Sequence, residues 1–228
     1  MSKAKNIALV FGTSGGIGSS LYTQLKKNYL VYGFSRKKEQ NSNIISEKYL
    51  KALSHEFIEK NLKIKIFINT IGFLHDSRYS PEKKCQDINL EYMQKCFEIN
   101  TIPTALMIKY FCPLMMKDEK SIFASISAKV GSISDNFLGG WYSYRASKAA
   151  LNQIIKTSSI EQKRLNKKLI MVSVHPGTVS TKLSAPFIKK KQVQTPLESA
   201  NKIVQLLENL NFEDSGLFFD YNKKIIPF

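Results

Sequence analysis

Tyr144 and Lys148 are the two residues of this sequence whose types and spacing most directly suggest chemistry. They stand four positions apart in a segment of helical character, so both side chains would lie on one face of a helix, one turn apart. An ammonium group there could hold a phenol in place and make its proton easier to lose. The pair predicts proton transfer to or from a carbonyl or alcohol, although such pairs also occur on solvated helices that have no such function.

A glycine-rich segment, residues 12–18, follows the first apolar run of the chain. Its glycines allow a tight turn and bring backbone N–H groups close to a pyrophosphate at the start of the next helix. An ordinary loop could also have this composition, but its place between an expected strand and an expected helix favours a dinucleotide site. The predicted binding residues are Gly12, Ser14, Gly16, Ile17 and Gly18.

The end of the second expected strand bears on the choice of cofactor. An acidic residue there would bind the 2′-hydroxyl of the adenosine ribose and repel a 2′-phosphate. The sequence instead has Ser35 and Arg36, which are suited to holding that phosphate. We therefore predict NADP in preference to NAD; the alternative is a basic surface turn without this role.

Further candidate residues follow other expected strands. Gly72 would let backbone pass close to a ligand, hydroxyl groups follow the fourth strand, and a Pro-Gly turn follows the fifth. The candidates are Asn69 and Gly72, then Asn100 at a helix end, then Ser127 and Ser132, and finally Pro176, Gly177 and Val179.

Apolar β-rich runs alternate along the chain with segments of helical period. This alternation is typical of an α/β protein with a Rossmann-like, doubly wound parallel sheet and helices on both faces. The expected strands are residues 6–11, 31–35, 65–69, 121–126, 169–175 and 217–220. The expected helices are residues 17–27, 47–60, 90–116, 147–165 and 196–210, the third divided or kinked by Pro103 and Pro113. Ligands should bind beyond the carboxyl ends of the strands, within one domain that covers residues 1–228.

Composition narrows the class of protein. No apolar run is long enough to span a membrane, and the first run, residues 7–11, is too short for a signal peptide, so we expect a cytoplasmic protein. The three cysteines are scattered, and no metal site is expected. The formal charge is +16, but the basic residues are mostly lysines spread along the chain, so nucleic-acid binding ranks last among the hypotheses.

Taken together, these segments resemble the short-chain dehydrogenase/reductase family along the whole chain. Its TGxxxGxG pattern is matched at residues 12–18, its NNAG at 69–72, its helix asparagine by Asn100, its YxxxK by Tyr144 and Lys148, and its PG turn at 176–177. Residues 127–136, 139–145 and 215–220 are similar to the C-factor-like branch, which is related to carbonyl reductases of the sniffer type.

The resemblance implies hydride transfer between NADPH and a small carbonyl or alcohol substrate. In that mechanism Tyr144 exchanges the proton, and Lys148 lowers the pKa of Tyr144 and holds the nicotinamide ribose. Asn100 positions a water molecule, and a serine hydroxyl polarises the substrate oxygen. Apolar residues in loops that are expected to wall the pocket suggest an apolar or aromatic carbonyl as substrate: Phe137, Leu138, Trp141 and Phe187, with His75, Asp76 and Tyr79 in the loop after residues 69–72. Residues 189–194 would belong to a lid over it.

The sequence departs from the family pattern at three places. Phe11 replaces the usual threonine before Gly12, which should alter packing more than binding. The acidic residue that the family has beside the adenine has no counterpart between Asn41 and Glu47. Ala128 stands where the catalytic serine is usual, so Ser127 or, less favoured, Ser132 must substitute.

Two questions stay open at this point. The missing serine and the C-factor resemblance leave an alternative, a cofactor-binding signalling or sensor protein with little turnover. The apolar residues of segments 105–116 and 146–160 predict a homodimer or homotetramer, unless both faces of these helices are buried within one subunit.

Overall fold

Six parallel strands form the sheet at the centre of the protein. The computed structural model describes residues 6–35, 43–188 and 193–228. The strands are β1 (Ile7–Phe11), β2 (Leu30–Phe34), β3 (Ile64–Asn69), β4 (Ser121–Ile126), β5 (Leu169–His175) and β6 (Phe218–Asp220). They lie in the order β2-β1-β3-β4-β5-β6, and every neighbouring pair is parallel. The doubly wound α/β fold expected from the sequence is confirmed.

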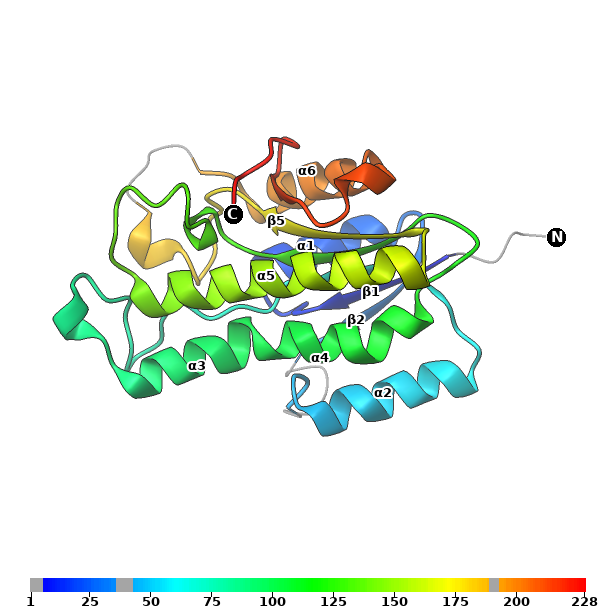
Figure 1. Ribbon diagram of the computed structural model, residues 1–228, viewed down its shortest axis with the longest axis horizontal. Helices are drawn as coiled ribbons and strands as arrows, with labels where there is room; N and C mark the ends of the chain where they lie inside the picture. Colours follow the sequence, from blue (N-terminus) through cyan, green and yellow to red (C-terminus); the bar gives the residue numbers. More distant parts are fainter. Residues whose placement is uncertain (1–5, 36–42, 189–192) are drawn as a thin grey trace.

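Helices cover both faces of this sheet (Figure 1). One face is packed by α1 (Gly16–Leu25) and α6 (Pro196–Glu208), whose apolar residues join one core cluster. The other face is packed by α2 (Glu47–Glu59), α4 (Ile102–Phe111) and α5 (Tyr142–Leu165). Helix α3 (Leu90–Asn100) precedes α4 and lies beside α5. Both faces are therefore buried, which is why the strands read as nearly continuous apolar runs.

Phenylalanine side chains dominate the core between the sheet and α4. The fully buried ring of Phe11 stacks on Phe34 at 4.7 Å and on Phe67 at 5.3 Å between ring centroids. Phe67 in turn stacks on Phe123 at 4.6 Å. The residue before Gly12 therefore serves the packing of the core, as the sequence suggested.

One expected division is confirmed, and one helix boundary differs from the sequence-based expectation. The segment 90–116 is divided, as expected, into two α-helices separated at Thr101 and a following 3₁₀ turn that contains Pro113, because each proline removes a backbone donor. Helix α5 begins at Tyr142 rather than at 147. Its first turn is bound by a residue 61 positions earlier in the chain, Glu82, which no local sequence pattern could reveal.

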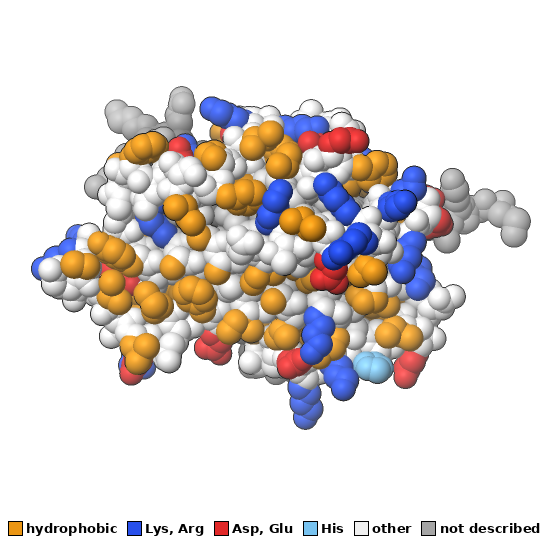
Figure 2. Space-filling view, viewed as in Figure 1, with side chains coloured by type: hydrophobic (Ala, Val, Ile, Leu, Met, Phe, Trp, Pro, Cys, Tyr) orange, Lys and Arg blue, Asp and Glu red, His pale blue; other side chains and the backbone are white. Residues whose placement is uncertain are grey.

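Three further observations concern the surface charges, the membrane-spanning potential of the helices and possible metal ligands. On the face shown in Figure 2, Lys and Arg side chains are scattered among apolar and uncharged ones. Among the described residues, no helix combines the length and apolarity needed to cross a bilayer. Within the same ranges, no group of three or more His, Cys, Asp or Glu side chains is arranged to hold a metal ion.

Candidate active site

Two cavities meet at the carboxyl ends of the central strands. The larger, about 780 Å³, extends from the glycine segment after β1 toward α3. The smaller, about 320 Å³, lies between the loops after β4 and β5 and the start of α5. Thr70, Ile71 and Gly72 line both, so the two form one extended cleft past the end of β3. An elongated ligand can lie along this cleft with one end in each cavity.

Tyr144 and Lys148 share the face of α5 that borders the smaller cavity. Both side chains are almost fully buried, with exposed fractions of 6% and 2%. The Lys148 ammonium lies 5.9 Å from the centroid of the Tyr144 ring and donates a hydrogen bond of 3.0 Å to the carbonyl of Ile126. Tyr144 and Lys148 therefore lie close together on one helix face, as expected, next to the end of β4.

Burial sets the proton affinity of this pair. It raises the pKa of Tyr144 above its usual range, and the nearby thiol of Cys96 adds to that effect. Burial also lowers the pKa of Lys148 to about 8, against a smaller opposite effect of Cys96. The net pKa of Tyr144 is thus raised, because removing the phenol from water disfavours its anion. A lowering of that pKa by Lys148 stays a prediction. At neutral pH the phenol holds its proton.

The two candidate serines differ in their surroundings. Ser127 is 3% exposed, lines the smaller cavity and has a hydroxyl without a hydrogen-bond partner among the described residues. The Ser132 hydroxyl instead donates to the carbonyl of Pro227 and accepts from the N–H of Asp135. Of these two serines, therefore, Ser127 is the one that lines the cavity with Tyr144 and has a hydroxyl free to bind a ligand there.

Further buried polar groups surround Ser127. Ser125 and Ser173 face each other in the register of β4 and β5, and both hydroxyls lack a partner among the described residues. His175, at the end of β5, lines the smaller cavity, and its Nδ1 likewise has no partner in the described chain. Burial lowers the pKa of His175 to about 4, so this imidazole is neutral near pH 7. Buried polar groups of this kind are usually satisfied by ligand or water.

Asn100 lies behind the cleft and lines neither cavity. Its Oδ1 accepts a hydrogen bond of 2.7 Å from the N–H of Phe73, and its Nδ2 donates to the Phe73 carbonyl at 3.0 Å. The same Nδ2 donates to the hydroxyl of Ser147 at 2.9 Å. Asn100 thus ties the loop after β3 to α5, next to Lys148, which is a role the sequence did not reveal.

The larger cavity has the features of a nucleotide cradle. Gly12, Ser14 and Ser35 line it, and α1 begins beside it at Gly16 with no side chain capping its N-terminus. A Cβ atom on Gly18 would lie 2.3 Å from the carbonyl oxygen of Gly12, so only glycine permits this close packing of turn and helix. Backbone N–H groups at such a helix start suit a pyrophosphate, and the residues present therefore fit a dinucleotide. Arg36 lies outside the described residues, as does most of the predicted lid, residues 189–192.

Not every predicted cofactor residue lines the cleft. Ile17, Pro176, Gly177 and Val179 border the smaller cavity. Gly16 and Gly18 lie beside the cleft and line neither cavity. The buried side chain of Asn69 donates to Thr104 and accepts from the N–H of Ile71, so it shapes the turn after β3. Asn43, which the sequence analysis missed, lines the larger cavity in the stretch where the family's acidic residue was sought.

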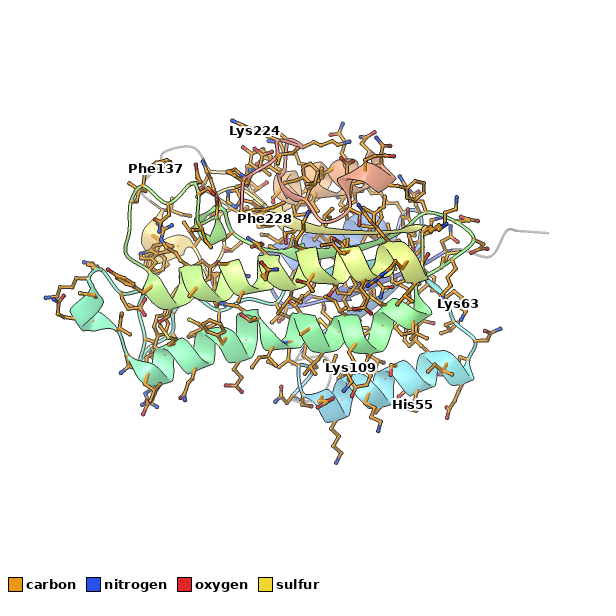
Figure 3. The ribbon with its side chains drawn as sticks, viewed as in Figure 1. His55, Lys63, Lys109, Phe137, Lys224 and Phe228 are labelled. Atoms are coloured by element: carbon orange, nitrogen blue, oxygen red, sulfur yellow. The ribbon has the colours of Figure 1, made fainter. Side chains whose placement is uncertain are left out.

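Aromatic side chains form one wall of the smaller cavity. Trp141 meets Phe187 edge-on at 5.1 Å and Tyr144 at 6.1 Å, and His75 backs Phe187 at 5.3 Å. The prediction that Phe137 and Leu138 also wall the pocket is wrong. They are 86% and 92% exposed, and Figure 3 shows Phe137 at the outer edge of the loop before α5. A turn of left-handed residues directs them outward and Trp141 inward.

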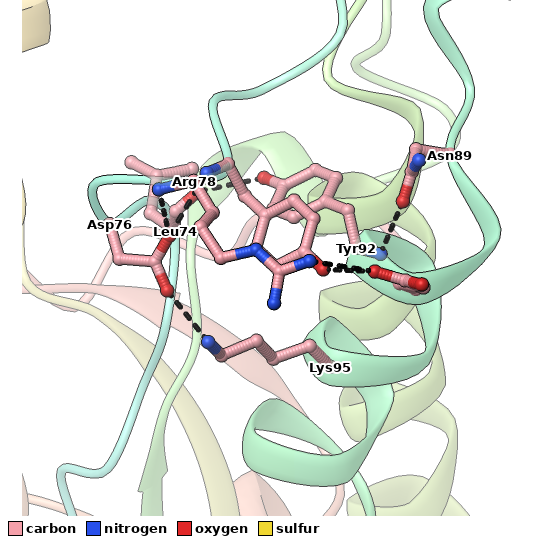
Figure 4. Close-up of polar contacts among 8 residues, drawn as sticks. Leu74, Asp76, Arg78, Asn89, Tyr92 and Lys95 are labelled. Carbon is pink, nitrogen blue, oxygen red and sulfur yellow. Dashed lines mark hydrogen bonds and ion pairs between the residues drawn. The ribbon is translucent and has the colours of Figure 1, made fainter.

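The loop after β3 is held on α3 by a polar network (Figure 4). The carboxylate of Asp76 accepts from the N–H groups of Arg78 and Tyr79 and from the Lys95 ammonium at 2.6 Å. The hydrogen bond from Lys95 is the largest cause that lowers the pKa of Asp76 to about 2. Arg78, Tyr79 and Lys95 all line the larger cavity. Asp76 thus organises the cavity wall rather than contacting a substrate.

Comparison with known proteins agrees with this geometry. A family model described as short chain dehydrogenase matches residues 41–192. The chain is 29% identical to the C-signal protein of Myxococcus xanthus, over 62% of this chain and 81% of that protein.

Two solved structures have the same fold. The NADPH-bound carbonyl reductase from chicken fatty liver superposes with a TM-score of 0.84 at 24% identity, covering 100% of this chain and 96% of that one. The carbonyl reductase Sniffer of Drosophila melanogaster superposes with a TM-score of 0.83 at 20% identity, covering 99% of this chain and 100% of that one. The similarity to C-signal agrees with the C-factor resemblance of the sequence motifs, and the two solved structures share the fold of this chain.

Proposed function

This chain belongs to the short-chain dehydrogenase/reductase family of NAD(P)-dependent oxidoreductases, and from that premise we propose that it is an NADPH-dependent carbonyl reductase. One observation carries the proposal. Tyr144, Lys148 and Ser127 line a single cavity that continues into the nucleotide cradle. No other described cavity combines these groups with the glycine segment.

In this proposal NADPH, when bound, supplies a hydride to the carbonyl carbon of the substrate. Ser127 donates a hydrogen bond to the carbonyl oxygen and polarises it. Tyr144, whose pKa burial raises, is protonated at neutral pH and gives its proton to the oxygen as negative charge develops there. Lys148 carries a positive charge below its pKa of about 8 and stabilises the resulting phenolate.

The aromatic wall supports an apolar or aromatic carbonyl as the substrate. The rings of Trp141 and Phe187, which meet edge-on, line the cavity, and Leu74 and Leu183 add aliphatic surface. Flat apolar groups gain most from such a lining. Benzil, an aromatic 1,2-diketone, is a suitable first probe.

Replacement of Tyr144 tests the reaction. Tyr144→Phe should abolish the NADPH-dependent reduction of aldehydes, ketones and quinones, followed as loss of reduced-nicotinamide absorbance, while NADPH binding stays nearly intact. Tyr142→Phe is the matched control, because Tyr142 begins the same helix, is 39% exposed and does not line the cavity. Undiminished turnover in Tyr144→Phe would overturn the assignment.

The preference for NADP rests on Ser35 and Arg36. Ser35 lines the larger cavity, and Arg36 follows it in sequence. Arg36→Ala should weaken the binding of NADPH far more than that of NADH, because only NADPH carries the 2′-phosphate. An equal effect on both cofactors would remove Arg36 from the phosphate site.

A cofactor-binding sensor with little turnover is the second candidate function. Ala128 in place of the usual serine and the similarity to C-signal favour it. Tight NADPH binding without turnover on every substrate of the panel would establish it over the reductase.

Assembly as a homodimer or homotetramer also stays a prediction. Met107 and Phe111 of α4 are buried within the subunit, and Leu106 packs partly against the same core. Ile102 of α4 and Ile160 of α5 are 51% and 55% exposed, so they are the side chains a subunit contact would cover. Light scattering of the purified protein measures the state directly, and a monomer would exclude the prediction.

A further inference from the structure

The buried carboxylate of Glu82 contacts the first turn of α5 at Ser143, the residue before Tyr144. Glu82 belongs to the loop between β3 and α3 and is only 3% exposed. Both of its carboxylate oxygens accept from the N–H of Ser143 at 3.2 Å, and one also accepts from the Ser143 hydroxyl. A carboxylate is seldom buried unless its hydrogen bonds are satisfied, so this arrangement is specific.

Glu82 takes the place of a local helix cap. The residue that precedes α5, Trp141, supplies no side-chain cap, and the first turn contains no acidic residue. The N-terminus of a helix has unpaired N–H groups and a partial positive charge, and both favour an anion there. Because Tyr144 lies in that first turn, the carboxylate of Glu82 holds the part of α5 that would otherwise fray first.

The backbone before α5 is held by the same residue. Gly139, Gly140 and Trp141 have φ angles of +62°, +63° and +55°, so three successive residues are left-handed. Trp141 is strained in this conformation, since it has a Cβ. Its N–H donates to the carbonyl of Glu82 at 2.6 Å, which offsets that strain.

Arg145 also holds the turn before α5. Its guanidinium donates to the carbonyls of Gly140 at 2.9 Å, Gly139 at 3.1 Å and Val130 at 3.2 Å. A Cβ atom on Gly140 would approach the Glu82 carbonyl oxygen to 3.3 Å, so the turn packs tightly against the loop. The consequence is that the Trp141 ring enters the smaller cavity, edge-on to Tyr144.

We propose that Glu82 is a positioning residue of the active site. It fixes the position of Tyr144 through its hydrogen bonds to Ser143, and it fixes the position of the Trp141 ring through its hydrogen bond to the Trp141 N–H. The inference rests on the proposed role of Tyr144 in carbonyl reduction. It goes beyond a stabilising cap because both side chains it fixes line the reaction cavity. A cap without this role would change stability and leave turnover of the folded enzyme unchanged.

The first measurement needs no turnover. Trp141 is the single tryptophan of the chain, so intrinsic tryptophan fluorescence reports on this turn alone. Glu82→Ala should shift the emission to longer wavelength and increase quenching by acrylamide, and Glu82→Gln, which keeps an acceptor oxygen, should show a smaller change. The control Glu119→Gln removes a carboxylate that pairs with Lys65 away from the site and should leave the emission unchanged. Unchanged emission in Glu82→Ala would overturn the proposal.

The second measurement is steady-state reduction of benzil with NADPH well below the unfolding temperature. Glu82→Ala should lower kcat by about tenfold to a hundredfold, the usual effect of a small displacement of a catalytic group. Glu82→Gln should recover part of kcat, and the double variant Glu82→Ala with Ser143→Ala should lose no more than Glu82→Ala alone. Altered fluorescence with unchanged kcat would reduce Glu82 to a structural cap and refute its role in the reaction. If the unmodified enzyme reduces no carbonyl of the panel, the proposed function fails, and the fluorescence result alone decides whether Glu82 fixes Trp141.

Discussion

Asn100 and Ser147 are joined by a buried hydrogen bond of 2.9 Å from the amide nitrogen to the hydroxyl. The bond links α3 to α5 immediately before Lys148. The same amide group binds both backbone atoms of Phe73, in the loop that follows Gly72. One side chain thus ties together three segments that border the cleft.

Asn100→Ala should therefore lower the free energy of unfolding as well as the rate of carbonyl reduction. Loss of the amide leaves the buried N–H and carbonyl of Phe73 without partners, which costs roughly 2–3 kcal/mol of unfolding free energy. Urea unfolding followed by circular dichroism measures this loss. A variant with full stability and reduced turnover would instead indicate that Asn100 acts mainly by holding a water molecule, as the family resemblance implied.

The two serines make a direct test of which hydroxyl completes the site. Ser127→Ala should lower kcat by about 10²–10³-fold, because the hydroxyl that polarises the carbonyl is lost. Ser132→Ala removes a bond to the Pro227 carbonyl and should leave kcat close to that of the unmodified enzyme. Steady-state kinetics on benzil measures both, and the reverse ranking would assign the role to Ser132.

Lys148 should make the stability depend on pH in a defined direction. Its pKa is lowered to about 8 in the folded protein from 10.5, so between these values the unfolded chain binds more protons. Stability should then rise with pH through this window, by on the order of 3 kcal/mol in total, relative to a variant that lacks the amine.

Urea unfolding of the unmodified protein and of Lys148→Met at pH 7 and pH 10 measures this dependence. Subtracting the two proteins cancels other titrating groups. A difference that stays constant with pH would show that Lys148 has an ordinary pKa.

The aromatic wall should determine the size of substrate that the enzyme prefers. Phe187→Ala should lower kcat/KM for benzil by about tenfold, a loss typical of removing one apolar contact. The effect on 2,3-butanedione, a 1,2-diketone without rings, should be small. Phe137→Ala, at a side chain that is 86% exposed, serves as the control. Equal losses for both diketones would mean that Phe187 does not contact the substrate rings.

The chain's sequence by itself determined the succession of strands and helices along the chain, the glycine-rich turn after the first strand and the placement of Tyr144 and Lys148 on one helix face. These features are local: buried parallel strands need continuous apolar runs, turns need glycine, and residues four apart share a helix face. Position along a strand also placed Ser127 and His175 at the carboxyl edge of the sheet, where the cleft lies.

Only the tertiary structure decided what these groups contact. The sequence favoured Ser127 but left Ser132 as an alternative, and in the structure the Ser132 hydroxyl donates to a carbonyl 95 positions away. The pKa of Tyr144 follows from burial, which depends on the packing of α3, α5 and the loops together. Glu82 acts on a helix 61 positions later. Contacts between distant segments have no periodic signature, and so the hydrogen bonds from Glu82 to the first turn of α5 became visible only in the folded chain.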